Sequence, residues 1–202
     1  MAIGDPYCTV EALREYCQIN DVVDDVYMLS IAKAISNGIE SYCHRQFNDA
    51  GSATARVFYP DSTSHVVVDD FSTITGLLVK TGTAFGTTLT DYTLEPLNGV
   101  QHGRAGFPYR TIRLHAGSFT SSSVGRPTVQ VTARWGWTAV PDDIKIAALM
   151  QGARKFKRRY SPTGLQTIGT GDMAFTAFVS RIEDPDVKEL LHDFVLAKFQ
   201  FC

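Results

Sequence analysis

The chain has 202 residues, a mass of 22.2 kDa, a formal net charge of −2 and a pI near 6.2. This length allows one domain, or one domain with an inserted module. The near-neutral charge gives no general attraction to nucleic acid or to an acidic membrane. No apolar run approaches the roughly 20 residues that cross a bilayer. The first residues have neither a basic n-region nor an apolar h-region, so we expect no signal peptide and a cytosolic product.

The first fifty residues predict two helices. Thr9 can cap a short helix that runs through Gln18. A longer helix is expected from residues 24–25 to about Arg45, because apolar residues recur there at three- and four-residue steps. Its two apolar lines are Val22, Val26, Leu29, Ala32, Ile35, Ile39 and Tyr42, and beside them Tyr27, Ile31, Ala34 and Gly38. A helix with so little polar surface should be covered on two sides, by its own chain or by a neighbouring copy. The glycine in mid-helix indicates a close approach of another helix.

The middle of the chain predicts a small antiparallel β module inserted between helices. Residues 48–54 have the composition of a linker. Short strands and glycine-rich turns follow from Ala55 to Arg134. The candidate strands are residues 57–59, 65–68, 77–79, 92–94, 111–114 and 129–133. The serine-rich residues 119–126 are expected to form a loop.

A strand, a joint and a helix follow one another directly between residues 128 and 162. Residues 128–134 alternate polar and apolar side chains, and Trp135-Gly136-Trp137 closes this strand with two large anchors around a residue that can bend. Pro141 then stands in the first turn of a helix that runs to Tyr160 and is stopped by Ser161-Pro162.

The last forty residues predict one more helix and an apolar end. Residues 173–179 fit a strand or part of a helix, and the sequence leaves both open. A final helix begins at Asp184-Pro185, and the chain ends in Phe199-Gln200-Phe201-Cys202. An aromatic end indicates docking, onto the chain itself or onto a partner. The predicted fold is α+β: a helical bundle, made of the N-terminal helix pair (1–50) and two later helices (139–202), with an inserted antiparallel β module (51–138).

No group of residues has the spacing of a known catalytic, cofactor or metal site. Two carboxylate pairs, at residues 24–25 and 142–143, stand where helices open, and a third, at 69–70, fits a turn. The histidines lack HxxH or HExxH spacing, no serine lies in GxSxG, and the loop at 169–172 has no Walker lysine. The cysteines are expected to be reduced, buried thiols; they are Cys8, Cys17, Cys43 and Cys202. We therefore expect no enzymatic activity, no cofactor and no metal.

The strongest charge signal is a basic cluster at the end of the helix predicted from Pro141. It consists of Arg154, Lys155, Lys157, Arg158 and Arg159. Cations at this position complement the helix dipole, so a solvated helix end is one interpretation. Contact with an acidic protein surface, including a neighbouring subunit, and contact with DNA phosphates are the others.

Two blocks of the sequence resemble the head-to-tail adaptor (head–tail connector, head completion) proteins of tailed phages. Residues 9–47 are similar to the family's N-terminal helix pair and end in a "Y-x-x-R-x-F"-like tail, from Tyr42 to Phe47. Residues 134–164 resemble a later block of the family, with an aromatic-Gly-aromatic joint, a Val140-Pro141 helix start and a basic-aromatic end. The β module between the blocks is longer than in the compact members.

This resemblance implies a structural role without catalysis or cofactor. Such proteins assemble as a ring, usually of twelve copies, beneath the portal at the capsid vertex. The ring extends the DNA channel and carries the next connector, a stopper or tail-terminator protein. Genomic DNA would pass through it without sequence specificity, and no membrane is involved. The implied location is the capsid–tail junction of the virion, after synthesis in the host cytoplasm.

The resemblance also assigns roles to residues. Phe194, Phe199 and Phe201 are expected to anchor the C-terminal end on the portal. Tyr27, Ile31 and Gly38 are expected to face either the helix from Pro141 or the next subunit. The basic cluster is expected to meet an acidic neighbour or to lie near DNA. The helical core is assigned to Val26, Leu29, Ile35 and Ile39.

Other classes of function remain open on the sequence alone. One is a β-sheet binding module, for instance for glycan, on a virion or cell surface. It predicts a monomer with a row of exposed aromatic side chains, namely Tyr59, Phe85, Tyr92 and Tyr109. Another is a small hydrolase, which predicts a deep polar pocket with perturbed carboxylates. A different neck or tail completion protein is the alternative within the phage class.

Overall fold

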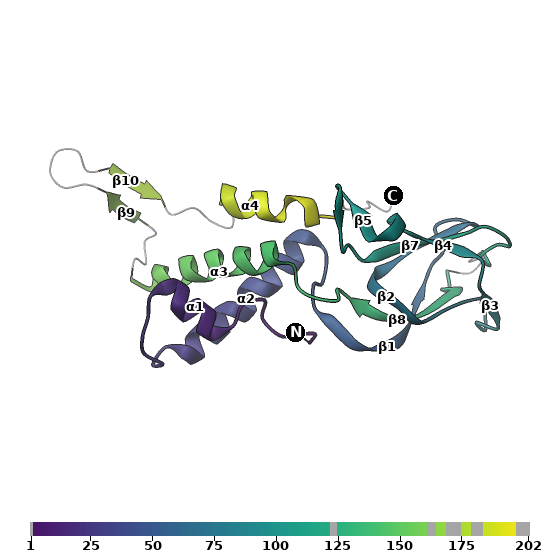
Figure 1. Cartoon of the computed structure of the whole chain (residues 1–202), viewed down its shortest axis with the longest axis horizontal. Coiled ribbons are helices and arrows are strands. Elements are labelled where there is room, and N and C mark those ends of the chain that lie inside the picture. The colour runs from purple at the N-terminus through teal and green to yellow at the C-terminus, as the bar shows by residue number, and fades with distance from the viewer. Residues whose placement is uncertain (1, 122–124, 161–164, 169–174, 179–183, 197–202) are drawn as a thin grey trace. The chain divides into compact units, whose positions relative to one another are not determined.

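The computed structural model describes residues 2–121, 125–160, 165–168, 175–178 and 184–196. The chain divides into two compact units, which are described separately here. The β unit comprises residues 1–3 and 46–139, and the helical unit comprises residues 4–45 and 140–202. Figure 1 shows helices in one unit and an antiparallel sheet in the other, so the predicted α+β class is confirmed.

The helical unit contains four α-helices within its described residues. They are α1 (Val10–Cys17), α2 (Asp25–Cys43), α3 (Asp142–Lys157) and α4 (Pro185–Leu191). Short 3-10 turns, η2 (Arg158–Tyr160) and η3 (His192–Phe194), follow α3 and α4. Between them lies a hairpin of β9 (Leu165–Ile168) and β10 (Phe175–Phe178), so the apolar residues 175–178 form a strand.

Local sequence signals explain where the helices begin and end. The Thr9 side chain accepts a hydrogen bond of 3.1 Å from the Ala12 N–H and caps α1. The Asp184 side chain accepts one of 3.2 Å from the Asp186 N–H, and Pro185 occupies the first turn of α4. Pro141 lies one residue before α3, as its N-cap, rather than inside the first turn as predicted.

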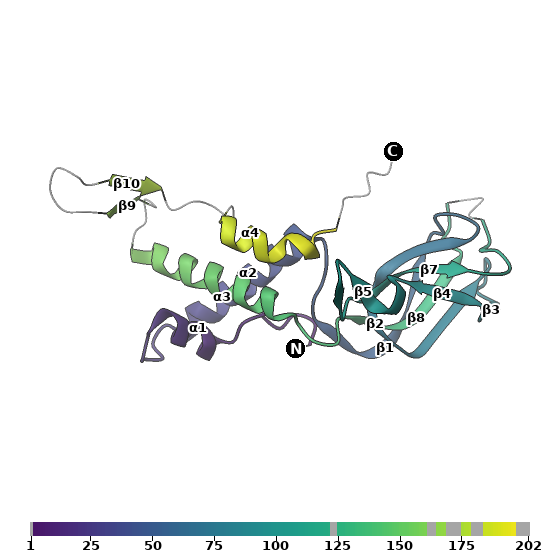
Figure 2. The same ribbon diagram turned by 45° about the horizontal axis from the view of Figure 1, so that its top comes forward.

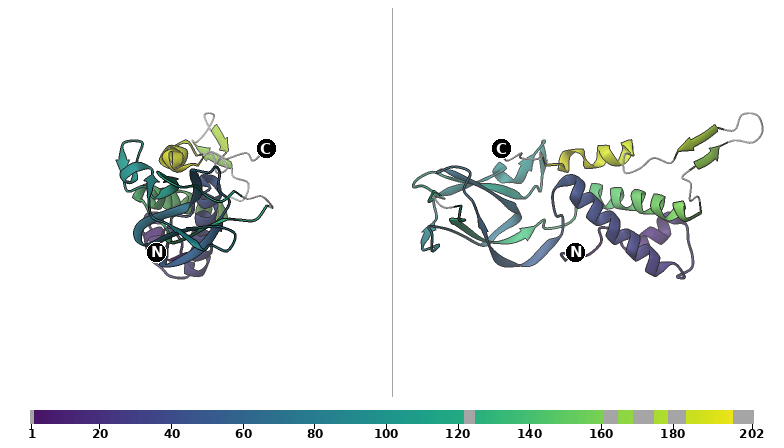
Figure 3. Two further views of the ribbon diagram at one scale, coloured as in Figure 1. Left: turned by 90° about the vertical axis from the view of Figure 1, so that its right-hand side faces the viewer. Right: turned by 180° about the vertical axis from the view of Figure 1, so that it is seen from behind.

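The core of the helical unit forms around α3, which contacts α1, α2 and α4. Figures 2 and 3 show α3 running between α4 on one side and α1 and α2 on the other. The buried face of α3 is rich in small residues, Ala147, Ala148, Gly152 and Ala153. A Cβ atom at Gly152 would lie only 3.0 Å from Leu13 of α1. Small side chains therefore allow three helices to lie close to α3.

The assignment of Val26 and Leu29 to the helical core is wrong. Val26 is 81% exposed and Leu29 is 38% exposed, whereas Ile35 and Ile39 are buried as expected. The buried face of α2 combines Ala32, Ile35 and Ile39 of the first predicted line with Ile31 of the second, and it adds Met28. Among the described residues nothing approaches Gly38 closely, since a Cβ atom there would meet nothing within 4 Å, so the expected approach of a neighbouring subunit stays a prediction. The apolar period was right, but it does not say which apolar line faces the chain's own core.

The β unit is built on one antiparallel sheet with the strand order β1-β8-β2-β7-β4, and β3 pairs with β2. The strands are β1 (Asp49–Phe58), β2 (His65–Thr81), β3 (Thr87–Leu89), β4 (Tyr92–Glu95), β7 (Tyr109–Leu114) and β8 (Val129–Gly136). A 3-10 turn, η1 (Leu97–Gly99), precedes a small hairpin of β5 (Val100–Gln101) and β6 (Arg104–Ala105).

Strand β2 is longer than the sequence predicts. It pairs with β7 through residues 65–71 and with β8 through residues 71–81, with a register shift in each ladder. The separate strands predicted at 65–68 and 77–79 are therefore one strand, and Asp69-Asp70 lies within it rather than in a turn. Most of the linker predicted at residues 48–54 instead belongs to β1, which pairs with β8.

The sheet packs a continuous hydrophobic core on one face. Alternate residues of β8 point into it, so Val129, Val131, Ala133 and Trp135 are buried. The Trp135 ring packs edge-on against Phe71 at a centroid distance of 6.1 Å, and its Nε1–H donates to the Thr54 carbonyl over 2.9 Å. The polar end of this tryptophan is thus satisfied while its ring is buried.

The joint after β8 depends on a glycine. Gly136 has a φ of +94°, and a Cβ atom there would lie 1.8 Å from the Asn48 carbonyl oxygen. Beyond it, Trp137 packs against Phe47 and Phe107, with ring centroids 5.3 and 5.4 Å away. The predicted pair of aromatic anchors around a bending residue is therefore observed, and the glycine also makes room for a neighbouring backbone.

Replacement of Gly136 by alanine should lower the free energy of unfolding by about 3 kcal/mol or more, because the Asn48 backbone must move. Gly106→Ala is the matched control, since Gly106 has a φ of +93° and open space around its Cβ position. It carries the same backbone strain without the clash. Urea unfolding of both variants measures the difference, and equal losses would contradict the close approach at Gly136.

Candidate functional site

The helical unit contains an apolar groove bounded by α2, α3 and α4. It holds about 430 Å³ of space, part of it open to solvent. Its walls include Ala34, Gly38 and Tyr42 of α2, Lys155 of α3, and Val187, Lys188 and Leu191 of α4. The absence of a side chain at Gly38 leaves the groove open on the α2 side, and the two exposed lysines bring charge to its edge.

The same unit exposes an apolar ridge at the start of α2. The ridge consists of Val22, Val23, Val26 and Leu29, with exposed fractions of 64, 84, 81 and 38%. Single exposed apolar residues are ordinary, but four within eight positions form a patch of the kind found at protein interfaces. Asp21 precedes the ridge; its Oδ1 accepts the Val23 N–H over 3.1 Å, and its side chain is exposed.

Two residues of the basic cluster form ion pairs within the helical unit. Arg154 forms an ion pair with Asp184, the N-cap residue of α4, whose side chain is only 4% exposed. Arg159 pairs with Asp24 at the start of α2 and lies over the Tyr27 ring, 5.7 Å from its centroid. These two arginines join helices within the unit. Lys155 and Lys157 are exposed, and Arg158 is half-buried.

The three residues predicted to pack helices or subunits have different surroundings. Tyr27 packs against Phe156 of α3 with ring centroids 6.1 Å apart, although its side chain is 42% exposed. Ile31 is buried in the helical unit, and Gly38 lines the apolar groove. Tyr27 and Ile31 thus contribute to the unit's own packing, which leaves Gly38 on an open surface.

The C-terminal end returns to the helical unit as far as it is described. Phe194, one of the three predicted portal anchors, lies in η3 and is only 2% exposed, so its side chain is covered within this chain. The Leu196 N–H then donates a hydrogen bond of 3.0 Å to the Cys43 carbonyl at the end of α2. The other two predicted anchors, Phe199 and Phe201, lie outside the described residues.

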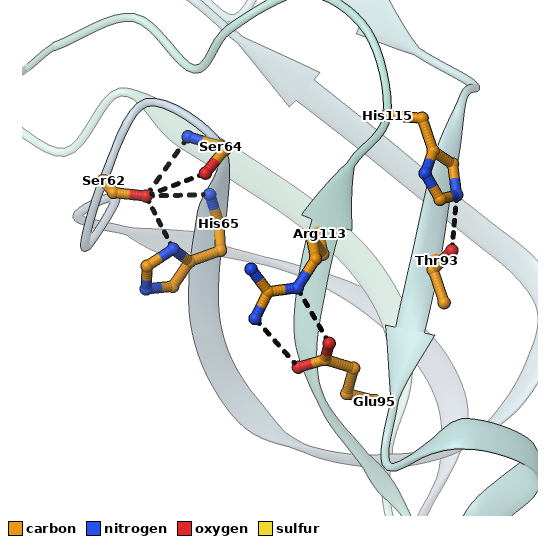
Figure 4. A network of polar contacts seen from close by, with 7 residues as sticks. All are labelled: Ser62, Ser64, His65, Thr93, Glu95, Arg113 and His115. Atoms are coloured by element: carbon orange, nitrogen blue, oxygen red, sulfur yellow. Dashed lines mark hydrogen bonds and ion pairs between the residues drawn. The ribbon is translucent and has the colours of Figure 1, made fainter.

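A polar network covers part of the outer surface of the β unit (Figure 4). Arg113 of β7 donates to Glu95 of β4 through Nε at 2.8 Å, and this hydrogen bond raises the pKa of Arg113. Ser62 Oγ lies 2.6 Å from His65 Nδ1 and accepts the N–H groups of Ser64 and His65. The Ser62 oxygen is therefore engaged in closing the turn before β2, which is a structural use of a serine–histidine pair.

The aromatic side chains proposed for glycan binding do not form an exposed row. Tyr59 is 57% exposed, but Tyr92 and Tyr109 pack against the hydrophobic core of the sheet. Tyr109 also stacks on Phe71 with ring centroids 5.7 Å apart, and Phe85 is half-buried. The arrangement that the binding-module alternative requires is thus not present.

Shifted pKa values in the described residues have structural causes. Burial raises the pKa of the Cys8 thiol to about 11 and that of Cys43 to about 12, so both are protonated at neutral pH. A hydrogen bond from Arg134 lowers the pKa of Asp49, and one from Lys145 lowers that of Asp142. These carboxylates serve ion pairs on β1 and in the first turn of α3.

The described residues hold no cluster of three or more His, Cys, Asp or Glu side chains suited to a metal ion. No helix in the same part of the chain has the length and apolar character needed to cross a bilayer.

Comparisons with known proteins show the fold. No protein-family model matches the sequence, and no curated protein matches it. The chain is similar to one from the neck of an empty gene transfer agent (GTA) particle, computed with C6 symmetry. That likeness covers 94% of this chain and 89% of the other, at a TM-score of 0.54 and 16% identity. A chain of the virion of a native GTA particle is similar over the same shares, with a TM-score of 0.50 and 18% identity.

Arg154→Met should lower the free energy of unfolding by about 1–3 kcal/mol, because the buried Asp184 carboxylate loses its counter-charge while Arg154 itself is partly exposed. Asp184→Asn keeps the capping oxygen but removes the charge, so the double variant should be more stable than Arg154→Met alone. Lys157→Met, at an exposed site, should change stability by less than about 0.5 kcal/mol. Urea unfolding measures all three. An Arg154→Met variant no less stable than this control would show that the ion pair does not hold α4 to α3.

Proposed function

We propose that this chain is a structural head-to-tail adaptor in the neck of a tailed-phage-like particle. It assembles as a ring beneath the portal, extends the DNA channel and carries the next connector, a stopper or tail-terminator protein. The observation that supports this most directly is the backbone likeness, over 94% of the chain, to a component of a neck structure computed with C6 symmetry. Two sequence blocks that resemble the adaptor family lead to the same proposal independently.

The exposed surface of the helical unit fits a subunit that is completed by its neighbours. The apolar ridge would be unfavourable on a protein that works alone, because it leaves four apolar side chains in water. In a ring each subunit makes heterologous contacts, with a different surface toward each neighbour. Twelve copies are the number that the family resemblance implies. The sixfold symmetry of the similar neck structure is compatible with this number.

The proposal assigns partners to the remaining candidate residues. We assign the exposed Lys155 and Lys157 to an acidic neighbouring surface or to DNA phosphates, whereas Arg154 and Arg159 pair within the unit. DNA contacts through these cations would carry no sequence specificity. Phe199 and Phe201 are assigned to the portal on the grounds of sequence. The proposed site of action is the capsid–tail junction of the virion.

Purified chain mixed with portal rings of its own particle should bind in a defined number of copies, and we expect twelve. Native mass spectrometry of the chain, the portal and the mixture measures this number. The chain alone is an insufficient test, because an adaptor can form its ring only on the portal. Failure to bind the portal, or density for this chain elsewhere than the neck in images of the particle, would contradict the proposal.

Deletion of residues 199–202 should abolish portal binding, because it removes the aromatic end that we assign to the portal, and it should leave the melting temperature unchanged. A finer variant is Phe199→Ser with Phe201→Ser, which removes the two aromatic rings. Its control, Lys198→Ser with Gln200→Ser, changes the alternate positions of the same segment. Co-sedimentation with portal rings measures binding. Equal binding by the two double variants would show that the rings do not anchor the chain.

A further inference from the structure

Two apolar features of the helical unit face in different directions from the same helix. Leu29 of the apolar ridge and Gly38 of the apolar groove are nine residues apart on α2. Nine residues are about two and a half helical turns, so the two positions point to opposite sides of α2. One copy of the unit therefore offers a projection on one side of this helix and a recess on the other.

Gly38 needs an explanation that the packing of the described residues does not supply. A glycine inside a helix costs roughly 1 kcal/mol relative to alanine. At Gly152 this cost is explained, because a Cβ atom would press on Leu13, but at Gly38 a Cβ atom would meet nothing within 4 Å. Among the described residues, then, no neighbour requires the glycine. Its effect is to keep the groove open.

We propose that the apolar ridge of one copy of this chain docks in the apolar groove of the next copy. This inference rests on the ring of the proposed function and names the contact that would build it. Val26 and Leu29 would enter the groove beside Gly38 and Tyr42, against Val187 of α4. Both surfaces belong to the helical unit, so each copy gives one ridge and receives one.

The charges beside the two surfaces are complementary. Asp21 is exposed next to the ridge, whereas Lys155 and Lys188 are exposed at the groove. The other acidic residues near the ridge, Asp24 and Asp25, are already paired with Arg159 and with Arg14 of the same chain. A groove with cations at its edge favours a ridge with a carboxylate over an occupant with basic flanks.

The contact is heterologous, and this decides what it can build. A patch that pairs with itself stops at two copies, whereas a ridge-to-groove contact leaves one free ridge and one free groove after every addition. A row of subunits joined in this way has no free ridge or groove only when it closes into a ring. The geometry of the helical unit is therefore of the type that a ring requires.

Two single substitutions separate the ridge from the groove. Val26→Arg places a charge on the ridge, and Gly38→Leu fills the groove at a position where the new side chain meets no atom of its own chain within 4 Å of the Cβ. Each should weaken assembly on portal rings by roughly 10- to 100-fold, because the contact would lose the burial of one or two aliphatic side chains. Melting temperatures should not fall. Val57→Arg, at an exposed valine of β1, is the control and should assemble normally.

Mixing the two variants tests the direction of the contact. A Val26→Arg copy keeps a working groove, and a Gly38→Leu copy keeps a working ridge, so one contact can form between them and neither partner can extend it. Without portal, native mass spectrometry of the mixture at high concentration should show dimers that contain one copy of each variant. Either variant measured by itself should stay monomeric. Asp21→Lys should weaken the contact by up to about fivefold, and Lys155→Glu with Lys188→Glu should restore it.

Different outcomes distinguish this inference from the proposed function. If both variants assemble on the portal as the unmodified chain does, the contact is wrong and the ring proposal stands. If Gly38→Leu alone loses portal binding while Val26→Arg forms normal rings, the groove takes a portal segment or the chain's own C-terminal end instead. If the unmodified chain neither binds the portal nor self-associates, both proposals fail.

Discussion

The helical unit depends on one packing requirement, which is that α3 must lie close to three other helices at once. Alanine and glycine on its buried face meet this requirement, and the contact between Gly152 and Leu13 shows how little space remains. Because α2 and α4 are held against α3, the space between them has fixed walls. The apolar groove is thus a product of the same packing that stabilises the unit, and the Arg154–Asp184 ion pair adds to it at the start of α4.

Features set by neighbouring residues could be predicted from the sequence, and features set by distant contacts could not. The cap at Thr9 and the Asp184-Pro185 helix start follow from local hydrogen bonding and backbone geometry. The spacing of apolar residues along α2 predicted the length of this helix. Whether Met28 or Val26 is buried, however, depends on where α3 lies. The polar residues 49–54 resemble a linker because β1 pairs along one edge only and exposes many of its side chains. A sequence also cannot tell that, among the described residues, the point of close approach is Gly152 and not Gly38.

Charge in this protein joins elements more often than it marks a site. Arg154 and Arg159, which stand out in the sequence as part of a basic cluster, connect α3 and the turn after it to the starts of α4 and α2. Arg134 and Arg56 do the same on the sheet, by pairing with Asp49 and Asp69. The surfaces left for partners are accordingly apolar, with a few exposed charges beside them. This division suits the joining role proposed above.

The double pairing of β2 has a mechanical consequence. Its two ladders, to β7 and to β8, are offset along the strand and meet at Phe71. Force applied along β2 would load the hydrogen bonds of both ladders in shear, so they would have to break together rather than one after another. Tension that reached this unit through its strands would thus be resisted by the sheet as a whole, which would suit the proposed place of this chain in the neck of a particle.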